Sequence, residues 1–291
     1  MFTLPSFAKI NLHLRVLGKR DDGFHEIFTV LQTISLCDEL KFETADSLEL
    51  ICNDPAVPAD ETNLIIRAAK ALDPVGGATI TLTKSIPMGG GLGGGSSNAA
   101  VTLIGLNRLW GLGRTTGDLA RIGTELGSDV PFFLAGGTAL GVGRGEQIEE
   151  LPDFSASDLI LITPDVHVPT AGAYARLDAE NLTNQDLNRI LRVCRSEAES
   201  PDFLSGALIN DFEPTVFAAF PEIGRAKQKL IDLGASRVLM SGSGASVFGF
   251  FDKEETRQAA LKALDNEVNW RKFAVAAVPR SEYRGKLGIA D

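Results

Sequence analysis

The sequence contains few cysteines and no long apolar run, and both absences narrow the class of protein. Cys37, Cys52 and Cys194 are odd in number and share no metal-ligand spacing. We therefore expect buried, reduced thiols, with no disulfide framework and no zinc site. No run reaches about 18 apolar residues, and the N-terminal stretch MFTLPSFAKINL has no apolar signal region. The sequence predicts a cytoplasmic protein without a membrane partner.

Positive charge is also scarce, since 28 Lys and Arg face 38 Asp and Glu for a formal net charge of −10. This balance argues against a broad nucleic-acid surface. It does not argue against a phosphate ligand, because such a ligand needs only a local cluster of donors. The 291 residues suit one large or two ordinary domains, with no internal repeat or low-complexity tract. We expect a monomer or a weak homodimer.

Glycine, by contrast, is concentrated in one stretch, PMGGGLGGGSSN at residues 87–98, with six glycines between 89 and 95. Residues 78–83 before it alternate with the period of a strand, and residues 99–106 after it carry apolar positions at helical spacing. Ser96, Ser97 and Asn98 are good N-cap residues for that helix. Glycine lets an anion approach the backbone closely, and a helix N-terminus adds free N–H donors and partial positive charge. The stretch therefore predicts a cradle for the triphosphate of ATP, formed by Pro87, Met88, Gly89, Gly90, Gly91, Leu92, Gly93, Gly94, Gly95, Ser96 and Ser97.

Two other glycine-rich phosphate motifs and a plain linker are alternatives. GGGLGG fits the dinucleotide pattern G-x-G-x-x-G, but the preceding strand is rich in Thr instead of apolar throughout, as a Rossmann strand would be. The Walker pattern is absent, since no Lys follows the glycines. A flexible linker would not be expected to lie between two periodic elements or to contain Met88 and Leu92.

The motif P-M-G-G-G-L-G-G-G-S-S-N-A-A resembles the second motif of the GHMP kinases. Most of that superfamily has serines where this chain has Gly94 and Gly95, a departure shared by the diphosphocytidyl-methylerythritol kinases, to which the chain is most similar. The resemblance extends over residues 5–250. It implies an α+β, two-domain fold, with a ribosomal-protein-S5-like domain at residues 1–155, a ferredoxin-like domain at 156–291, and the site in the cleft between them.

Residues 7–17 alternate as a strand, with Lys9 and Asn11 on one face. The spacing alone favours a solvated face. FAKINL, however, resembles the family's first motif, which implies that Lys9 lies in the active site and that Asn11 lines the substrate pocket. GSDVPFF is similar to the segment that supplies the catalytic aspartate, although such a residue is commonly a cap or turn residue. We therefore expect Asp129 to be the catalytic base and to contact substrate.

Three further residues match the family's cytosine-binding positions. The sequence KRDDGFH resembles R-x-D-G-Y-H, which implies that His25 and its aromatic neighbour Phe24 hold the base. Phe24 keeps a ring for stacking but lacks the usual tyrosine hydroxyl. Tyr174 falls where the family places a second ring, so that Phe24 and Tyr174 are expected to sandwich the base. A structural histidine and a packed tyrosine are the plain alternatives.

Two further segments resemble parts of the family's site, one beside the adenine and one near the phosphoryl acceptor. NLIIRAA resembles the adenine-side segment, so Asn63 and Lys84 become candidates for contact with the nucleotide base, although Asn63 alone reads as a helix N-cap. Residues 237–248, RVLMSGSGASVF, read as a hairpin and resemble the motif that closes the site near the phosphoryl acceptor. Residues 40–52 read as a strand pair, and residues 116–126, 181–206 and 221–233 as helices.

The resemblance implies ATP-dependent phosphorylation of the 2-hydroxyl of a cytidine-diphosphate-linked methylerythritol, with Mg²⁺ accompanying ATP. The sequence assigns no protein ligand to the metal. A kinase for homoserine or mevalonate has no use for base-binding residues at 24, 25 and 174. A non-catalytic nucleotide sensor would be expected to lack Lys9 or Asp129. A nicotinamide dehydrogenase would need the Rossmann pattern rejected above.

Overall fold

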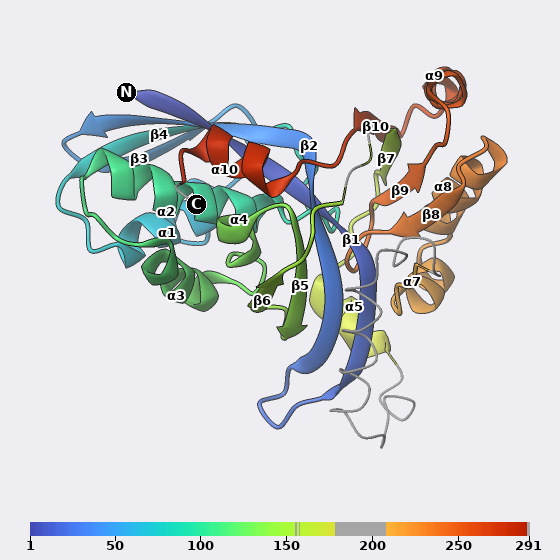
Figure 1. Cartoon of the computed structure of the whole chain (residues 1–291), viewed down its shortest axis with the longest axis horizontal. Helices are drawn as coiled ribbons and strands as arrows, with labels where there is room; N and C mark the ends of the chain where they lie inside the picture. The colour runs from blue at the N-terminus through green and yellow to red at the C-terminus, as the bar shows by residue number, and fades with distance from the viewer. Residues whose placement is uncertain (155, 157, 178–207, 290–291) are drawn as a thin grey trace.

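The computed structural model describes residues 1–154, 156, 158–177 and 208–289 of the chain. Within these residues the fold is α+β, as predicted, and two sheets form two lobes (Figure 1). The long strands β1 (Phe2–Lys19) and β2 (His25–Ala45) run from one lobe to the other and pair antiparallel along most of their length. A turn at residues 20–24 joins them.

The first sheet also contains β3 (Leu48–Cys52), β4 (Gly77–Thr83), β5 (Thr138–Gly143) and β6 (Gln147–Glu150), in the order β3-β4-β2-β5-β6 with β1 on β2. Its helices are α1 (Leu64–Ala71), α2 (Gly94–Leu109), α3 (Thr116–Leu126) and α4 (Phe132–Ala135). The middle of α2, from Ser97 to Leu106, is buried at every position. This helix therefore forms the centre of the first core, and its N-terminus has a fixed position.

The second sheet has the order β10-β7-β9-β8 and is antiparallel. Its strands are β7 (Leu159–Pro164), β8 (Arg237–Met240), β9 (Val247–Phe250) and β10 (Trp270–Val275), with helices α5 (Thr170–Arg176), α7 (Glu213–Ala219), α8 (Pro221–Asp232) and α9 (Glu254–Ala263) and the short 3₁₀ helix η2 (Leu264–Asn266). Helices separate β7 from β8 and β9 from β10, which is the β-α-β-β-α-β order of a ferredoxin-like unit. The predicted helix at 181–206 and Cys194 lie outside the described residues.

The expected strand pair at residues 40–52 is wrong in its pairing. β3 follows β2 after a short turn but pairs with β4 in parallel, and β4 lies between them. Gly77 makes this insertion possible, because a Cβ there would lie 2.4 Å from the carbonyl oxygen of Ala45 and the amide nitrogen of Ser47. The β4 strand can therefore begin in close contact with the turn that joins β2 to β3.

The N-cap expected at residues 96–98 is also wrong, since α2 begins at Gly94 and its N-cap is Gly93. Gly93 has a φ of 69°, which a residue with a side chain rarely adopts, so the chain enters the helix earlier than a Ser or Asn cap would allow. A second correction concerns Cys37 and Cys52, which are free thiols but half-buried instead of buried.

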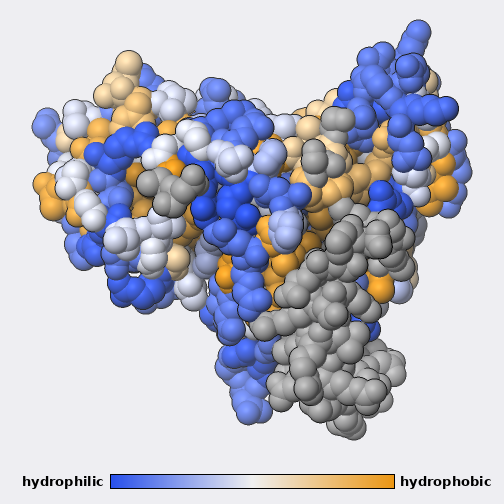
Figure 2. Space-filling model, viewed as in Figure 1, coloured by the Kyte–Doolittle hydropathy of each residue, from blue (hydrophilic) through white to orange (hydrophobic). Residues whose placement is uncertain are grey.

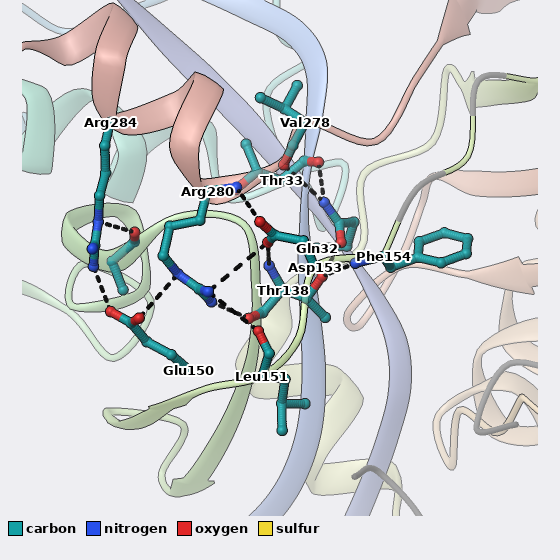
Figure 3. Close-up of polar contacts among 11 residues, drawn as sticks. Gln32, Thr33, Thr138, Glu150, Leu151, Asp153, Phe154, Val278, Arg280 and Arg284 are labelled. Atoms are coloured by element: carbon teal, nitrogen blue, oxygen red, sulfur yellow. Dashed lines mark hydrogen bonds and ion pairs between the residues drawn. The ribbon is translucent and has the colours of Figure 1, made fainter. Parts of the chain in front are cut away.

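The last helix, α10 (Arg280–Leu287), packs on the first lobe although it follows the second sheet. Tyr283 and Leu287 are fully buried in the core around α2. Arg280 donates to the carbonyl oxygens of Thr138 and Leu151, and its backbone N–H donates to Asp153 (Figure 3). The expected second domain, residues 156–291, therefore ends with a segment whose core contacts belong to the first lobe.

Candidate active site

A cavity of about 1010 Å³ is lined by residues of both lobes. Its walls come from β1, the glycine-rich loop before α2, the start of α5 and the β8–β9 turn. The surface is hollowed between the lobes, and apolar residues gather where the lobes meet (Figure 2). The cavity is lined by all the residues predicted for ATP and substrate except Ser97.

Hydrogen bonds from both lobes anchor the glycine-rich loop. The backbone N–H of Lys9 donates to Leu92 O at 3.0 Å, and that of Ser246 donates to Gly90 O at 3.0 Å. The Ser241 hydroxyl donates to Gly91 O at 2.9 Å. The loop is thereby fixed to β1 on one side and to the β8–β9 turn on the other, so its free N–H groups have a fixed direction.

Two glycines of this loop are required by close packing. Gly91 has a φ of 73°, and a Cβ there would lie 2.2 Å from Ser241 O. A Cβ on Gly93 would lie 2.8 Å from the Phe133 ring. The first intrahelical bond of α2 runs from Ser97 N to Gly93 O at 2.8 Å, so the N–H groups at 94–96 precede it. These donors and the helix dipole can stabilise an anion at the cleft.

The Lys9 ammonium lies 3.5 Å from the Asp129 carboxylate, and the two residues are 4% and 36% exposed. Lys9 also donates to Asn11 Oδ1 at 2.7 Å, and the Asn11 amide donates to the Thr29 hydroxyl at 2.8 Å. The solvated face suggested by the strand spacing is therefore wrong, because Lys9 and Asn11 are both buried. The network orients Lys9 toward the one carboxylate that lines the described cleft.

Asp129 owes its position to the apolar residues after it. The helix α3 ends at Leu126, as predicted, with Gly127 as its C-cap, and Val130 N donates back to Gly127 O at 3.1 Å. Val130, Phe132 and Phe133 are fully buried in the first core. These buried side chains hold the turn that carries Asp129 against the first core, while the Asp129 carboxylate remains open to the cleft.

The expected cytosine-binding residues all line the cleft, and two of their rings stack on each other. His25 stacks on Tyr174 with ring centroids 4.9 Å apart and planes at 26°, so one face of the Tyr174 ring is covered by His25. The rings of Phe212 and Tyr174 pack nearly perpendicular to each other, with centroids 4.8 Å apart. Phe24 is 53% exposed, and the Arg144 guanidinium lies 4.8 Å from its ring centre.

The protonation states of His25 and Tyr174 follow from burial. Burial, with a smaller effect of the Lys19 charge, lowers the pKa of His25 below its usual 6.5, so the imidazole is neutral near pH 7. Burial raises the pKa of Tyr174 to about 12, and the Asp129 carboxylate adds to the shift. A neutral imidazole offers one donor and one acceptor, which suits the polar edge of a nucleobase.

Asn63 and Lys84 both line the cleft. Asn63 is the N-cap of α1, as its position before a helical stretch predicted: its Oδ1 accepts from Ile65 N at 2.8 Å, and its amide donates to Pro58 O. Lys84 donates to Asp38. Ser97 differs from the other expected ATP residues, since it is fully buried and its hydroxyl accepts from Ser6.

Sequence reasoning missed several residues that the structure brings to the site. Ser241 anchors Gly91, and its place in the third motif could have indicated this role. Thr29 and Asp38 lie within a long strand and carry no spacing signal, because their partners come from distant segments.

No group of three or more His, Cys, Asp or Glu side chains that could hold a metal ion occurs in the described part of the chain. A magnesium ion held chiefly by phosphate oxygens and water, with Asp129 close by, fits these residues better than a protein cage. No helix among the described residues is long and apolar enough to span a bilayer.

Comparison with known proteins agrees with this geometry. The model of the GHMP kinases N terminal domain matches residues 63–137, and that of the GHMP kinases C terminal domain matches residues 179–269. The 4-diphosphocytidyl-2-C-methyl-D-erythritol kinase of Chlorobium limicola is 42% identical over 90% of this chain and 92% of its own length. The Bacillus cereus kinase of the same name is 44% identical over 83% of this chain and 85% of its own length.

Solved structures give the same result. A crystal structure of a 4-(cytidine 5'-diphospho)-2C-methyl-D-erythritol kinase is 33% identical, with a TM-score of 0.76 over 95% of this chain and 99% of that one. Methanococcus jannaschii mevalonate kinase shares the fold, with a TM-score of 0.69 at 14% identity over 95% of this chain and 98% of that one. The chain therefore belongs to the GHMP kinases and, within them, to the family of the 4-diphosphocytidyl-2-C-methyl-D-erythritol kinases.

Proposed function

We propose that this protein transfers the γ-phosphoryl group of ATP to the 2-hydroxyl of 4-diphosphocytidyl-2-C-methyl-D-erythritol, giving the 2-phosphate and ADP in non-mevalonate isoprenoid synthesis. The observation that carries the proposal is the single cleft in which an anion cradle, a lysine–aspartate pair and a group of base-binding side chains face one another.

The glycine-rich loop is proposed to hold the triphosphate. Its anchored backbone directs the N–H groups at the start of α2 toward the phosphates, where they stabilise negative charge without reorganisation. Magnesium, when bound with ATP, would neutralise phosphate charge and would be held chiefly by phosphate oxygens and water.

Asp129 is proposed to accept the proton of the substrate hydroxyl, and Lys9 to orient Asp129 and to stabilise charge on the transferred group. Phosphoryl transfer passes through a loose transition state, so positioning supplies most of the barrier reduction and the base acts late. Asn11 holds the Lys9 ammonium in place. Lys9 thus connects the phosphate side of the cleft to the acceptor side.

The cytosine is proposed to lie against Phe24 and His25, with Tyr174 completing the pocket. Because His25 stacks on Tyr174, the base can stack on that face of Tyr174 only if His25 moves, whereas contact with Phe24 does not require this movement. The neutral imidazole can then donate to and accept from the polar edge of the base.

We further propose two domains divided near residues 155 and 156, with α10 returning to the first. The protein is proposed to act in the cytoplasm as a monomer or weak homodimer on a small-molecule substrate, without nucleic acid or membrane partners. Asn63 and Lys84 are proposed to contact the adenine nucleotide.

The test is ADP release with ATP and Mg²⁺ and one of four acceptors: 4-diphosphocytidyl-2-C-methyl-D-erythritol, homoserine, mevalonate or none. Turnover with the first acceptor alone is expected. Turnover with homoserine or mevalonate would indicate a different GHMP kinase. Measurable ATP binding without any turnover would indicate a nucleotide sensor, and the roles of Lys9 and Asp129 would be withdrawn.

A further inference from the structure

A fully buried carboxylate lies behind the nucleotide side of the cleft. Asp38, in β2, has no exposed surface. Its Oδ1 accepts from the backbone N–H groups of Ser85 and Ile86, at 2.7 and 2.8 Å. Its Oδ2 accepts from Lys84 Nζ at 2.5 Å and from the Asn98 amide at 2.9 Å. All four donors lie either in the segment that leads into the glycine-rich loop or at the start of α2.

The partner ammonium occupies a position that disfavours a cation. Lys84 Nζ lies 3.1 Å from the point that a Cβ on Gly94 would occupy, and Gly94 is the first residue of α2. Positive charge is unfavourable at a helix N-terminus. The Lys84 side chain is also only 7% exposed, and burial lowers the pKa of its ammonium, while the Asp38 charge acts in the opposite direction. A buried cation in this place requires an anionic partner.

We propose that Asp38 is a positioning residue of the nucleotide site, which holds the Lys84 ammonium at the start of α2 so that it contacts bound ATP. The inference rests on the proposed role of the glycine-rich loop as the ATP site. Lys84 lines the cleft and Asp38 does not, so Asp38 acts on the nucleotide only through its neighbours.

The variants follow from the hydrogen bonds. Asp38→Asn keeps an acceptor oxygen for Ser85 and Ile86 but turns an NH₂ group toward the Lys84 ammonium. Lys84→Met removes the cation and leaves Asp38 with three donors. The double variant removes both charges. Asp153→Asn is the matched control, since Asp153 also accepts from two backbone N–H groups and pairs with a cation, Arg280, but lies outside the cleft (Figure 3).

Calorimetric titration with the ATP analogue AMP-PNP and Mg²⁺, and separately with CDP, measures the two ends of the cleft. Each single variant is expected to raise the Kd for AMP-PNP on the order of tenfold, as for loss of a charge-assisted contact. The double variant should be no weaker than the weaker single variant, and the Kd for CDP should change less than about twofold. The control should lower Tm without changing either Kd.

Three results would overturn the inference. One is wild-type affinity in Lys84→Met. The second is a loss from Asp38→Asn that is equally large in the Lys84→Met background, which would show a structural role alone. The third applies if the Asp38→Asn protein is insoluble. In that case the double variant with Lys84→Met should be soluble again, and a double variant that stays insoluble contradicts the pairing. A wild-type protein that binds no AMP-PNP would instead contradict the proposed function.

Discussion

Replacement of Gly91 by alanine tests whether the glycine-rich loop is shaped by the hairpin that packs on it. Gly91 has a φ of 73°, and its added Cβ would lie 2.2 Å from Ser241 O and 3.0 Å from Gly244 O. Because these neighbours are backbone oxygens, no rotamer change can relieve the clash. The loop and the β8–β9 turn must therefore separate.

The expected magnitude combines backbone strain with two broken hydrogen bonds. The left-handed conformation costs alanine about 1–2 kcal/mol. Separation of the two segments also breaks the bonds from Ser241 Oγ to Gly91 O and from Ser246 N to Gly90 O, each contributing about 1 kcal/mol. We expect Gly91→Ala to lower the free energy of unfolding by about 3–4 kcal/mol.

Gly95→Ala is the matched control in the same glycine-rich stretch, residues 87–98. A Cβ there meets nothing closer than Leu64 Cδ1 at 3.7 Å, and Gly95 is helical. Stability should be unchanged or rise by about 0.5 kcal/mol. Urea unfolding without nucleotide measures both variants. A Gly91→Ala protein within about 0.5 kcal/mol of wild type, or an equal loss in both variants, would show that the hairpin does not shape the loop.

Three further predictions concern the chemistry, the base site and pH. Asp129→Asn and Lys9→Met should each lower kcat at least about a hundredfold, with Kd for AMP-PNP unchanged in Asp129→Asn, because the carboxylate acts on the acceptor. Phe24→Leu should raise KM for the cytidine substrate about tenfold because base stacking is weakened, while KM for ATP stays constant. Burial, with a smaller effect of Arg15, lowers the pKa of His13 from 6.5 to about 4. The stability that neutral His13 contributes is therefore complete above pH 6.5 and is lost as the pH falls toward 4. The loss should reach about 3 kcal/mol, and His13→Phe should remove this part of the pH dependence in urea unfolding.

Each of these predictions has a contradicting outcome. Near-normal kcat in either variant of the lysine–aspartate pair would remove the proposed roles. A Phe24→Leu protein with raised KM for ATP but unchanged KM for the cytidine substrate would place the base elsewhere. An unchanged slope of stability against pH between 6.5 and 4 in His13→Phe would show that other groups cause it.

Local structure followed from the sequence where the signal was local. The helix at 116–126 and the β8–β9 hairpin were predicted because periodicity and glycine stops mark them. The start of α2 was missed, since a left-handed Gly93 is not visible in a run of glycines. Capping preferences therefore indicated the wrong first residue.

Long-range arrangement was beyond sequence reasoning. Alternation in β1 separated Lys9 and Asn11 from Ile10 but did not tell which face another element covers, and both faces are buried. The insertion of β4 between β2 and β3 depends on a close contact at Gly77. Asp38 gathers donors from residues 84–98, which no spacing within β2 could indicate.

The most direct measurement is ³¹P NMR of the product formed from ATP, Mg²⁺ and 4-diphosphocytidyl-2-C-methyl-D-erythritol, with wild type and Asp129→Asn in parallel. We expect one new phosphomonoester on the 2-hydroxyl, an intact cytidine diphosphate linkage and ADP in equal amount, and almost no product with the variant. Inorganic phosphate without a new ester, a cleaved diphosphate, or undiminished product with the variant would contradict the proposed transfer.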